Sequence, residues 1–184
     1  KRFHMPTCVL RRKPPACRGA ELVPMFTKVP SARSITITGF TVFALDQITK
    51  AWAASALDSD SIEILWKLRL HLTTNTGFAF STGKGLGPLL GLLAACVVVL
   101  LWRMRTKFSS RLGTFALGLV LGGACGNLAD RLFRVPRWGR GAVVDFIDFR
   151  FWPVFNLADA AIVSGVVMLG ANMWFEQRGD QRNA

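Results

Sequence analysis

The sequence predicts a mainly α-helical, polytopic membrane protein with four transmembrane helices. The chain is 51% hydrophobic and has a positive mean hydropathy. Its apolar residues form four runs, each near the length of about 17–25 residues that crosses a bilayer as a helix. A soluble domain of 184 residues does not need four such runs. The runs are Ser34–Ala54, Leu86–Trp102, Leu112–Ala129 and Val154–Phe175.

Charged residues are nearly absent from the four runs. The second and third runs contain none, the first contains Asp46 and Lys50, and the fourth contains only Asp159. A carboxylate at the centre of a membrane helix raises the insertion free energy by roughly 2.5 to 3.5 kcal/mol, and by less near the interface. Asp159 is therefore a functional candidate by its position alone.

Residues 1–33 precede the first run and are predicted to form a basic, flexible cytoplasmic extension. Five prolines interrupt this stretch, and its basic residues follow no helical period. The apolar run that follows is too long for a cleavable signal peptide, and no small-residue cleavage site closes it. Residues 176–184, after the last run, are predicted to be a cytoplasmic tail.

The distribution of basic residues predicts the orientation. The extension carries eight lysines and arginines against one glutamate, and the link 103–111 carries four basic residues and no acid. The positive-inside rule places both in the cytoplasm, so that both termini lie inside after four crossings. The last connection, about 131–153, is predicted to be an extracytoplasmic loop. It also holds five arginines, so the asymmetry is not uniform.

The formal net charge of +12 is attributed mostly to this topology. A secondary role is the attraction of anionic lipid headgroups, which makes membrane lipids expected partners. A nucleic-acid partner is not expected, because the sequence has no basic face on a soluble domain with interleaved aromatic residues. Nothing in the chain requires more than a monomer.

With this orientation, the unusual polar residues meet at the outer face of the membrane. Residues three or four positions apart share one side of a helix, so each such pair can point into one pocket. The groups expected at this face are Asp46, Lys50, Asn75, Gly77, Asn127, Asp130, Arg131, Asp145, Asn156 and Asp159.

Two carboxylates facing each other in such a pocket have a particular chemistry. Asp145 comes just before the fourth run and could reach the same face as Asp159, and the residues alone would equally allow Asp130 as the second carboxylate. Like charges about 3 Å apart do not both ionise easily, so one carboxyl group stays protonated while the other is a base. The base takes a proton from water, which attacks a peptide carbonyl, and the acid protonates the carbonyl oxygen.

Several of these residues also have structural explanations. Asp46 and Lys50 can form an interfacial ion pair, and Asp130 with Arg131 can cap a helix end and extend to water. Asp148 is predicted to be a solvated loop charge. These interpretations stay open at the level of the residues alone.

Neither a metal nor a cofactor is expected. The four cysteines show no metal-ligand spacing, and two of them, Cys96 and Cys125, lie inside apolar runs. The two histidines, His4 and His71, are far apart in the sequence and suggest neither a catalytic triad nor a zinc site.

Five short strings resemble the lipoprotein signal peptidase family, also called signal peptidase II or prolipoprotein signal peptidase. The resemblance covers nearly everything from about residue 35 to residue 175. One string alone would be weak, but five in this order are specific. The strings are LDQITK (45–50), NTGFAFS (75–81), GGACGNLADR (122–131), VDFI (144–147) and FNLAD (155–159).

The resemblance implies an aspartic endopeptidase of the bacterial inner membrane. Its substrates would be prolipoproteins, cut immediately before a cysteine that already carries diacylglycerol. The catalytic pair would be Asp145 and Asp159, and Asp130 would not be the second catalytic residue. The residues implied to shape or support the site are Asp46, Lys50, Asn75, Gly77, Asn127, Asp130, Arg131, Asn156 and Ala158.

The resemblance also implies a small extracytoplasmic β-sheet subdomain, expected at about 62–80. Leucines at 68, 70 and 72 alternate there with Arg69 and His71, which is the period of a half-exposed strand. Phe78 and Ala160 depart from the family pattern, where smaller and hydroxyl residues are common. Phe78 would change the shape of the substrate groove, and Ala160 would lack a hydrogen bond beside Asp159.

Two other classes of function are compatible with an intramembrane carboxylate. A proton or ion carrier needs ionisable groups from one side of the bilayer to the other, and the inner halves of the four runs are apolar. A noncatalytic scaffold or insertion factor needs no pair of aspartates in register. Replacement of either aspartate by asparagine separates these alternatives from a peptidase.

Overall fold

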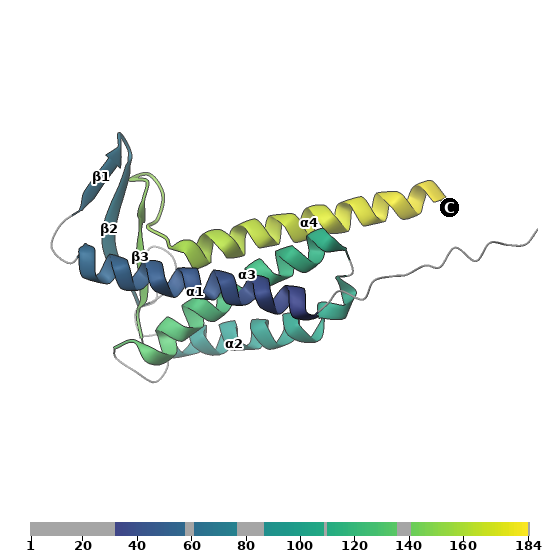
Figure 1. Ribbon diagram of the computed structural model, residues 1–184, viewed down its shortest axis with the longest axis horizontal. Helices are drawn as coiled ribbons and strands as arrows, with labels where there is room; N and C mark the ends of the chain where they lie inside the picture. Colours follow the sequence, from purple (N-terminus) through teal and green to yellow (C-terminus); the bar gives the residue numbers. More distant parts are fainter. Residues whose placement is uncertain (1–31, 58–60, 77–86, 109, 136–140, 184) are drawn as a thin grey trace, which may run out of the picture.

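The structure is a computed structural model that describes residues 32–57, 61–76, 87–108, 110–135 and 141–183 (Figure 1). Helices and a small sheet make up these residues. The helices are α1 (Ala32–Ala56), α2 (Gly87–Arg103), the short 3-10 helix η2 (Arg105–Lys107), α3 (Arg111–Phe133) and α4 (Leu157–Asn183), and the strands are β1 (Ile62–Leu65), β2 (Leu68–Asn75) and β3 (Val143–Asp148). The chain is thus mainly helical with a small β-sheet.

The α3 helix is the centre of the helical bundle and packs against α1, α2 and α4. Glycines allow its backbone to approach two of these helices closely. A Cβ atom on Gly122 would lie 2.5 Å from the carbonyl oxygen of Gly39 in α1, and one on Gly123 would lie 2.4 Å from that of Ala158 in α4. Small residues spaced by four, Gly118 and Gly122 here, are typical of helices that pack in membranes.

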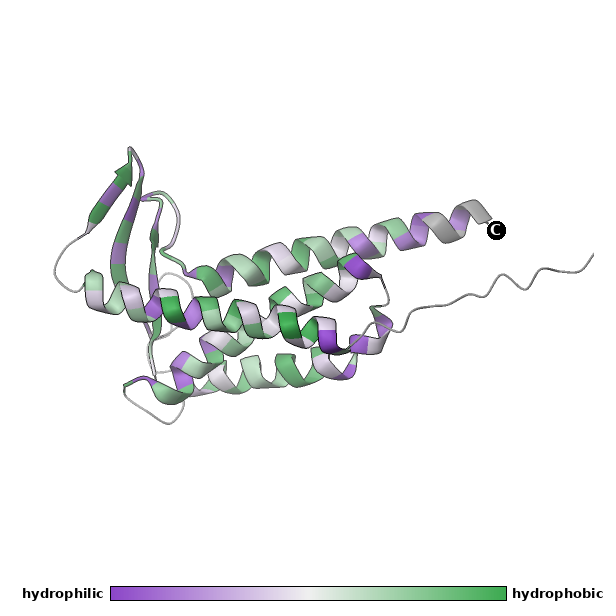
Figure 2. Cartoon of the chain, viewed as in Figure 1, coloured by the Kyte–Doolittle hydropathy of each residue, from purple (hydrophilic) through white to green (hydrophobic). Residues whose placement is uncertain are grey.

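Figure 2 shows that α2 and the middle of α4 are mostly hydrophobic, while the C-terminal part of α4 is hydrophilic, and large apolar side chains of both helices are exposed. Within the described residues, two helices are long and apolar enough to cross a membrane, namely Arg111–Phe133 and Leu157–Arg178, and Pro88–Arg103 is a shorter apolar helix. The α1 helix has the length, but its hydropathy is lowered by polar residues such as Asp46 and Lys50. Four crossings therefore stay a prediction.

The three strands form one antiparallel sheet in the order β1-β2-β3, and it lies across one end of the bundle (Figure 1). Thr73 pairs with Asp145, and Arg69 pairs with Asp148. The sheet packs on the end of α1 through Ala53 and Leu57, which contact Val144 and Phe146. This packing brings the VDFI segment next to the polar residues of α1 and α3.

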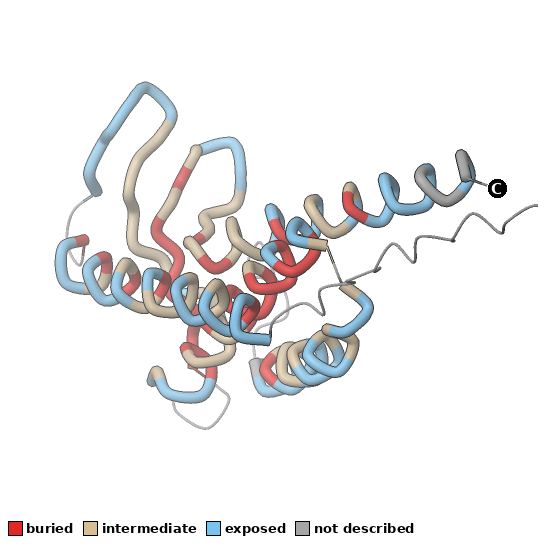
Figure 3. The backbone as a smooth tube through the Cα atoms, turned by 45° about the vertical axis from the view of Figure 1, so that its right-hand side comes forward, coloured by how far each residue is buried: buried red, intermediate tan, exposed pale blue. Residues whose placement is uncertain are grey.

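The strand β3 is the main difference from the sequence prediction. The region 131–153 was expected to be a loop, yet its part 143–148 pairs with β2 and is almost entirely buried (Figure 3). The hairpin expected at about 62–80 is present as β1 and β2. Residues 77–80 of that expected region, Gly77 among them, lie outside the described residues.

The ends of the helices also differ from the apolar runs. The α4 helix begins at Leu157 rather than near Val154, because Phe155 pairs with Ile147 as an isolated β-bridge. Asp159 therefore lies in the first turn of α4 and not a full turn inside it. The same helix continues to Asn183, so most of the predicted tail is helical. Of the predicted extension at 1–33, only residues 32 and 33 are described, and they begin α1.

Candidate active site

The structure brings the predicted polar residues together where the sheet meets the bundle. Asp145 is the third residue of β3, and Asp159 is the third residue of α4. Each is contributed by a different element, and both face residues of α1 and α3. The predicted site residues found there are Asp46 and Lys50 of α1, Asn75 of β2, Asn127, Asp130 and Arg131 of α3, Asp145 of β3, and Asn156, Ala158 and Asp159 at the start of α4.

Asn156 links the two candidate catalytic carboxyl groups. Its Nδ2 donates to Asp145 Oδ1 at 2.6 Å, and its Oδ1 accepts from the backbone N–H of Asp159 at 2.9 Å. In return, the backbone N–H of Asn156 donates to Asp159 Oδ2 at 3.3 Å. This reciprocal pair is the capping-box arrangement of a helix N-terminus. Local helix capping thus holds Asp159 against the same asparagine that bonds Asp145.

Asn127 holds the other oxygen of Asp159. Its Nδ2 donates to Asp159 Oδ1 at 2.7 Å, and its Oδ1 accepts from Lys50 Nζ at 2.8 Å. A lysine ammonium is only a donor, so this bond determines which end of the Asn127 amide faces Asp159. A second donor, Asn156 Nδ2, lies 3.3 Å from Asn127 Oδ1, the oxygen that also accepts from Lys50. The Asn127 amide is therefore oriented from two sides.

The Lys50 side chain is fully buried, and its ammonium group contacts three oxygen atoms. In addition to Asn127, it contacts Asp46 Oδ2 at 2.8 Å and Asp130 Oδ2 at 2.8 Å. Three N–H donors with three acceptors fully satisfy a buried ammonium. A buried charge without such partners would shift the balance strongly towards unfolding.

The two carboxylates around Lys50 receive further donors. Asp46 Oδ1 accepts from the backbone N–H of Ala158 at 2.9 Å, which ties α1 to the start of α4. Asp130 Oδ1 accepts from Arg134 Nε at 2.6 Å, and Asp130 Oδ2 lies 3.4 Å from the backbone N–H of Val144. The network therefore connects three helices and β3 through charge-assisted bonds, which are stronger than neutral ones.

The electrostatic environment of Asp145 favours its protonated form. Burial raises the pKa of this carboxyl group, and the nearby negative charge of Asp159 raises it further, to about 7. Hydrogen bonds from Asn156 and Asn75, and the positive charge of Lys50, act in the opposite direction. The Asp145 carboxyl group is thus populated in both protonation states near neutral pH.

The burial of Asp130 and Arg131 argues against one interpretation made from the sequence. Asp130 is 1% exposed and Arg131 is 9% exposed, so this pair does not extend from a helix end into water. The positive charge of Arg131 acts on the carboxylates of Asp145, Asp130 and Asp159. Both residues are buried among the charged groups at the sheet end of the bundle.

The prediction of a solvated Asp148 is wrong. Its side chain is buried in β3, where Arg69 Nε donates to it at 2.7 Å and the backbone N–H of Arg150 donates at 2.6 Å. Burial alone would raise the pKa of Asp148, but these hydrogen bonds and the charge of Arg69 lower it below its ordinary value. Asp148 is an ion-paired residue of the sheet.

Sequence reasoning missed two participants. Gln47 Nε2 donates to Asp46 Oδ2 at 3.1 Å and to the carbonyl oxygen of Gly126 at 3.2 Å, and Arg134 pairs with Asp130. A signal existed for each, since Gln47 is a polar residue in an apolar run and Arg134 lies four positions after Asp130. Among the described residues, no three His, Cys, Asp or Glu side chains are grouped so that they could hold a metal ion.

The apolar helices of the bundle are typical of a membrane protein. A buried and a half-buried carboxyl group that share a hydrogen-bonding partner at one end of the bundle are typical of an enzyme active site. The family described as "Signal peptidase (SPase) II" matches residues 38–175. The chain therefore belongs to the signal peptidase II family, whose members are proteases that process lipoprotein precursors.

Relatives in other bacteria support the same assignment. A lipoprotein signal peptidase of Mycobacterium avium is 42% identical over 131 residues, which cover 70% of this chain and 72% of the relative. One of Streptomyces coelicolor is 42% identical over 130 residues, which cover 69% of this chain and 63% of the relative. A bacterial membrane enzyme solved by the in meso method at 2.3 Å resolution superposes with a TM-score of 0.70. It is 26% identical, and the match covers 80% of this chain and 90% of that structure.

Proposed function

We propose that this protein is an aspartic endopeptidase that removes the signal peptide from prolipoproteins by cleavage before the diacylglyceryl-modified cysteine. The observation that carries the proposal is the joint coordination of Asp145 and Asp159 by Asn156, with Asn127 on the far side of Asp159. Family membership supports the prolipoprotein substrate.

The two carboxyl groups take different roles in the proposed reaction. Asp145, with a pKa of about 7, carries the proton before the reaction, and Asp159 is the base. Asp159 removes a proton from water, the water oxygen attacks the scissile carbonyl carbon, and Asp145 protonates the carbonyl oxygen. The carbon–nitrogen bond of the tetrahedral intermediate then breaks as Asp159 donates its proton to the departing amine nitrogen, and a hydroxyl group of the intermediate returns a proton to Asp145. The pair titrates as a unit, because the two charges interact.

The surrounding residues keep this pair in position. Asn156 and Asn127 orient the two carboxyl groups, and Lys50 orients Asn127. Asp46 holds the start of α4 through the backbone of Ala158. Arg131 supplies positive charge to the site, and Asn75 hydrogen-bonds Asp145. Gly77, outside the described residues, is proposed to shape the site from the segment that follows β2.

We further propose that all four helices cross the bacterial inner membrane, with both termini in the cytoplasm and the sheet at the outer face. The basic link 103–111 lies at the end opposite the sheet, which agrees with the positive-inside rule (Figure 1). A substrate held by its signal helix and acyl chains then arrives by lateral diffusion, which reduces the entropy lost on binding. The protein would work as a monomer.

A proton carrier is less well supported. Among the described residues, the buried charged side chains gather at the sheet end, on α1, α3 and β3. A relay would need such groups along the whole length of the bundle.

The test uses a purified precursor with a diacylglyceryl-modified cysteine and the same precursor without the lipid. Asp145→Asn and Asp159→Asn are each expected to reduce cleavage of the lipidated precursor by at least about 10³-fold, because each variant removes one member of the acid–base pair. Asp148→Asn is the matched control, since it changes a buried aspartate of the same strand that bonds Arg69 instead. Wild-type rates in either of the first two variants, or equal cleavage of both precursors, would contradict the proposal.

A further inference from the structure

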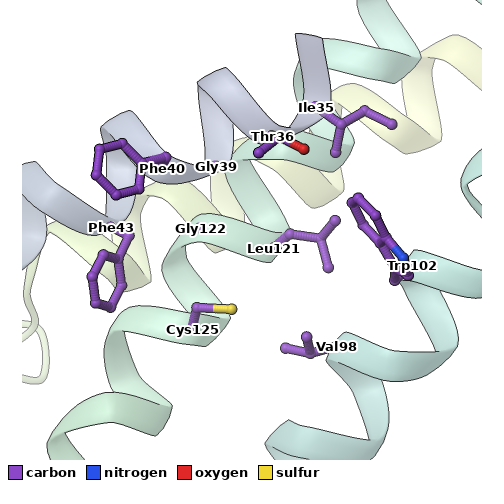
Figure 4. A pocket seen from close by; sticks show the side chains of 10 residues that line it. All are labelled: Ile35, Thr36, Gly39, Phe40, Phe43, Val98, Trp102, Leu121, Gly122 and Cys125. Atoms are coloured by element: carbon purple, nitrogen blue, oxygen red, sulfur yellow. The ribbon is translucent and has the colours of Figure 1, made fainter. Parts of the chain in front are cut away.

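An apolar groove runs along the bundle between α1 and α2, with α3 as its floor (Figure 4). Its volume is about 450 Å³, within the range of about 300–1,000 Å³ that is typical of ligand sites. The walls come from Phe40 and Phe43 of α1 and from Val98 and Trp102 of α2, with Cys125 and Leu121 below. None of these residues belongs to the candidate active site.

The groove is elongated parallel to the helix axes. On α1 it extends from Ile35 to Phe43, which is roughly 12 Å at the rise of an α-helix. Phe43 lies one turn before Asp46, so one end of the groove approaches the level of the active site. The other end, at Ile35 and Trp102, lies at the end of the bundle opposite the sheet (Figure 1). This shape suits a hydrocarbon chain that runs along the bilayer normal.

Basic residues lie at the end of the groove marked by Trp102. The guanidinium carbon of Arg105 is 4.8 Å from the centroid of the Trp102 ring, and its Nη1 donates to the Trp102 carbonyl oxygen at 3.0 Å. The link 103–111 adds three more basic residues and contains no acid. Arginine and lysine side chains at a membrane surface attract anionic lipid headgroups. The apolar groove therefore ends beside a cluster suited to a phosphate.

We infer that this groove binds one acyl chain of an anionic glycerophospholipid whose phosphate group contacts Arg105 and its basic neighbours. The inference rests on the proposed placement of the helices in a membrane. It differs from the proposed peptidase function, because the groove lies between α1 and α2 while the candidate catalytic groups lie between β3 and α4. The lipid is a bound component of the folded bundle.

Native mass spectrometry of the purified full chain tests the inference. The delipidated protein is mixed with equal amounts of phosphatidylglycerol and phosphatidylcholine that have identical acyl chains. One phosphatidylglycerol per protein is expected to be retained. Arg105→Gln is expected to weaken this binding about fivefold, as for the loss of one basic residue at a lipid surface. Arg178→Gln is the matched control, because Arg178 also stacks on a tryptophan, Trp174, at the same end but away from the groove.

A second pair of variants tests the acyl-chain site. Val98→Phe inserts a ring into the groove and is expected to weaken phosphatidylglycerol binding about tenfold, as for the displacement of two methylene groups. Val99→Phe changes the next residue, which is exposed and does not line the groove, and is expected to bind as the wild type does.

Three results would overturn the inference. Equal retention of phosphatidylglycerol and phosphatidylcholine would show that the groove takes up any bilayer acyl chain without recognising the headgroup. Equal effects of Val98→Phe and Val99→Phe would exclude the groove as the acyl-chain site. A protein dimer without bound lipid would assign the groove to a second copy of the chain. Asp145→Asn is expected to retain the lipid, so failure of the peptidase proposal and failure of this inference are distinguishable.

Discussion

Lys50 is a fully buried cation that connects several polar residues at the sheet end of the bundle. Its ammonium group contacts Asp46, Asp130 and Asn127, and each contact measures 2.8 Å. Through Asn127 it orients Asp159, and through Asp46 it is linked to the start of α4. One side chain therefore combines a stabilising role with a positioning role.

Replacement of this lysine tests both roles. Lys50→Met keeps the apolar stem but leaves Asp46 and Asp130 without the cation between them, and it is expected to reduce the stability by about 3–5 kcal/mol. Thermal unfolding in detergent measures this loss. Lys67→Met is the control, because Lys67 is exposed in the β1–β2 turn. A change in melting temperature no larger than that of the control would contradict the role assigned to Lys50.

The raised pKa of Asp145 predicts a pH dependence of stability. The folded state favours the protonated carboxyl group, so the wild type loses stability as the pH rises from about 4, where the unfolded group titrates, through about 7. Asp145→Asn cannot ionise, so its stability relative to the wild type is expected to rise across this window, by on the order of 4 kcal/mol by pH 8. Unfolding curves at pH 5 and pH 8 measure the difference. An offset that is the same at both pH values would refute the assignment.

At the scale of elements, the packing of α3 depends on glycines rather than on large side chains. The apolar stretch 112–129 predicted a helix, but not which helices it contacts. A glycine at 122 is required because the backbone of α1 lies against it. The close approach brings Asp46 and Lys50 within reach of Asn127 and Asp130.

Two alanine substitutions separate helix propensity from packing. Alanine is more favourable than glycine in a helix by about 1 kcal/mol, so Gly170→Ala, with no atom within 4 Å of the added Cβ, is expected to be neutral or stabilising. Gly122→Ala places its Cβ against the Gly39 carbonyl oxygen and is expected to lower the melting temperature. Equal melting temperatures for the two variants would show that α1 and α3 do not pack as described.

The strand β3 could not be predicted from its own residues. Val143 to Asp148 is a short apolar run, and such runs are compatible with a strand, a buried turn or the start of a helix. Its pairing partner, β2, lies about 70 positions earlier in the chain. The burial of Asp148 follows from the same pairing, since Arg69 is opposite it in the sheet.

At the scale of the whole molecule, the two ends of the bundle differ. The sheet and the buried charges lie at one end, and the basic link 103–111 lies at the other (Figure 1). This polarity agrees with a protein that crosses the membrane with its site at the outer face.

Labelling of single cysteines tests the orientation. In a variant without the native cysteines, Leu65→Cys in the β1–β2 hairpin is expected to react with a membrane-impermeant thiol reagent in intact cells. Lys107→Cys is expected to react only after the membrane is permeabilised. Both positions are exposed, so accessibility within the protein does not distinguish them. Reaction of both cysteines from the same side would contradict the proposed topology.

The sequence by itself determined the helical class, the family and most of the polar residues that meet at one end of the bundle. Apolar runs and spacings of three or four residues are local properties, so they can be read directly from the chain. Only the tertiary structure decided that Asp148 is ion-paired in a sheet, that Asp130 shares Lys50 with Asp46, and that Asn156 joins Asp145 to Asp159. These outcomes depend on distances between residues that are remote in the sequence, and only the packing of the helices and strands sets those distances.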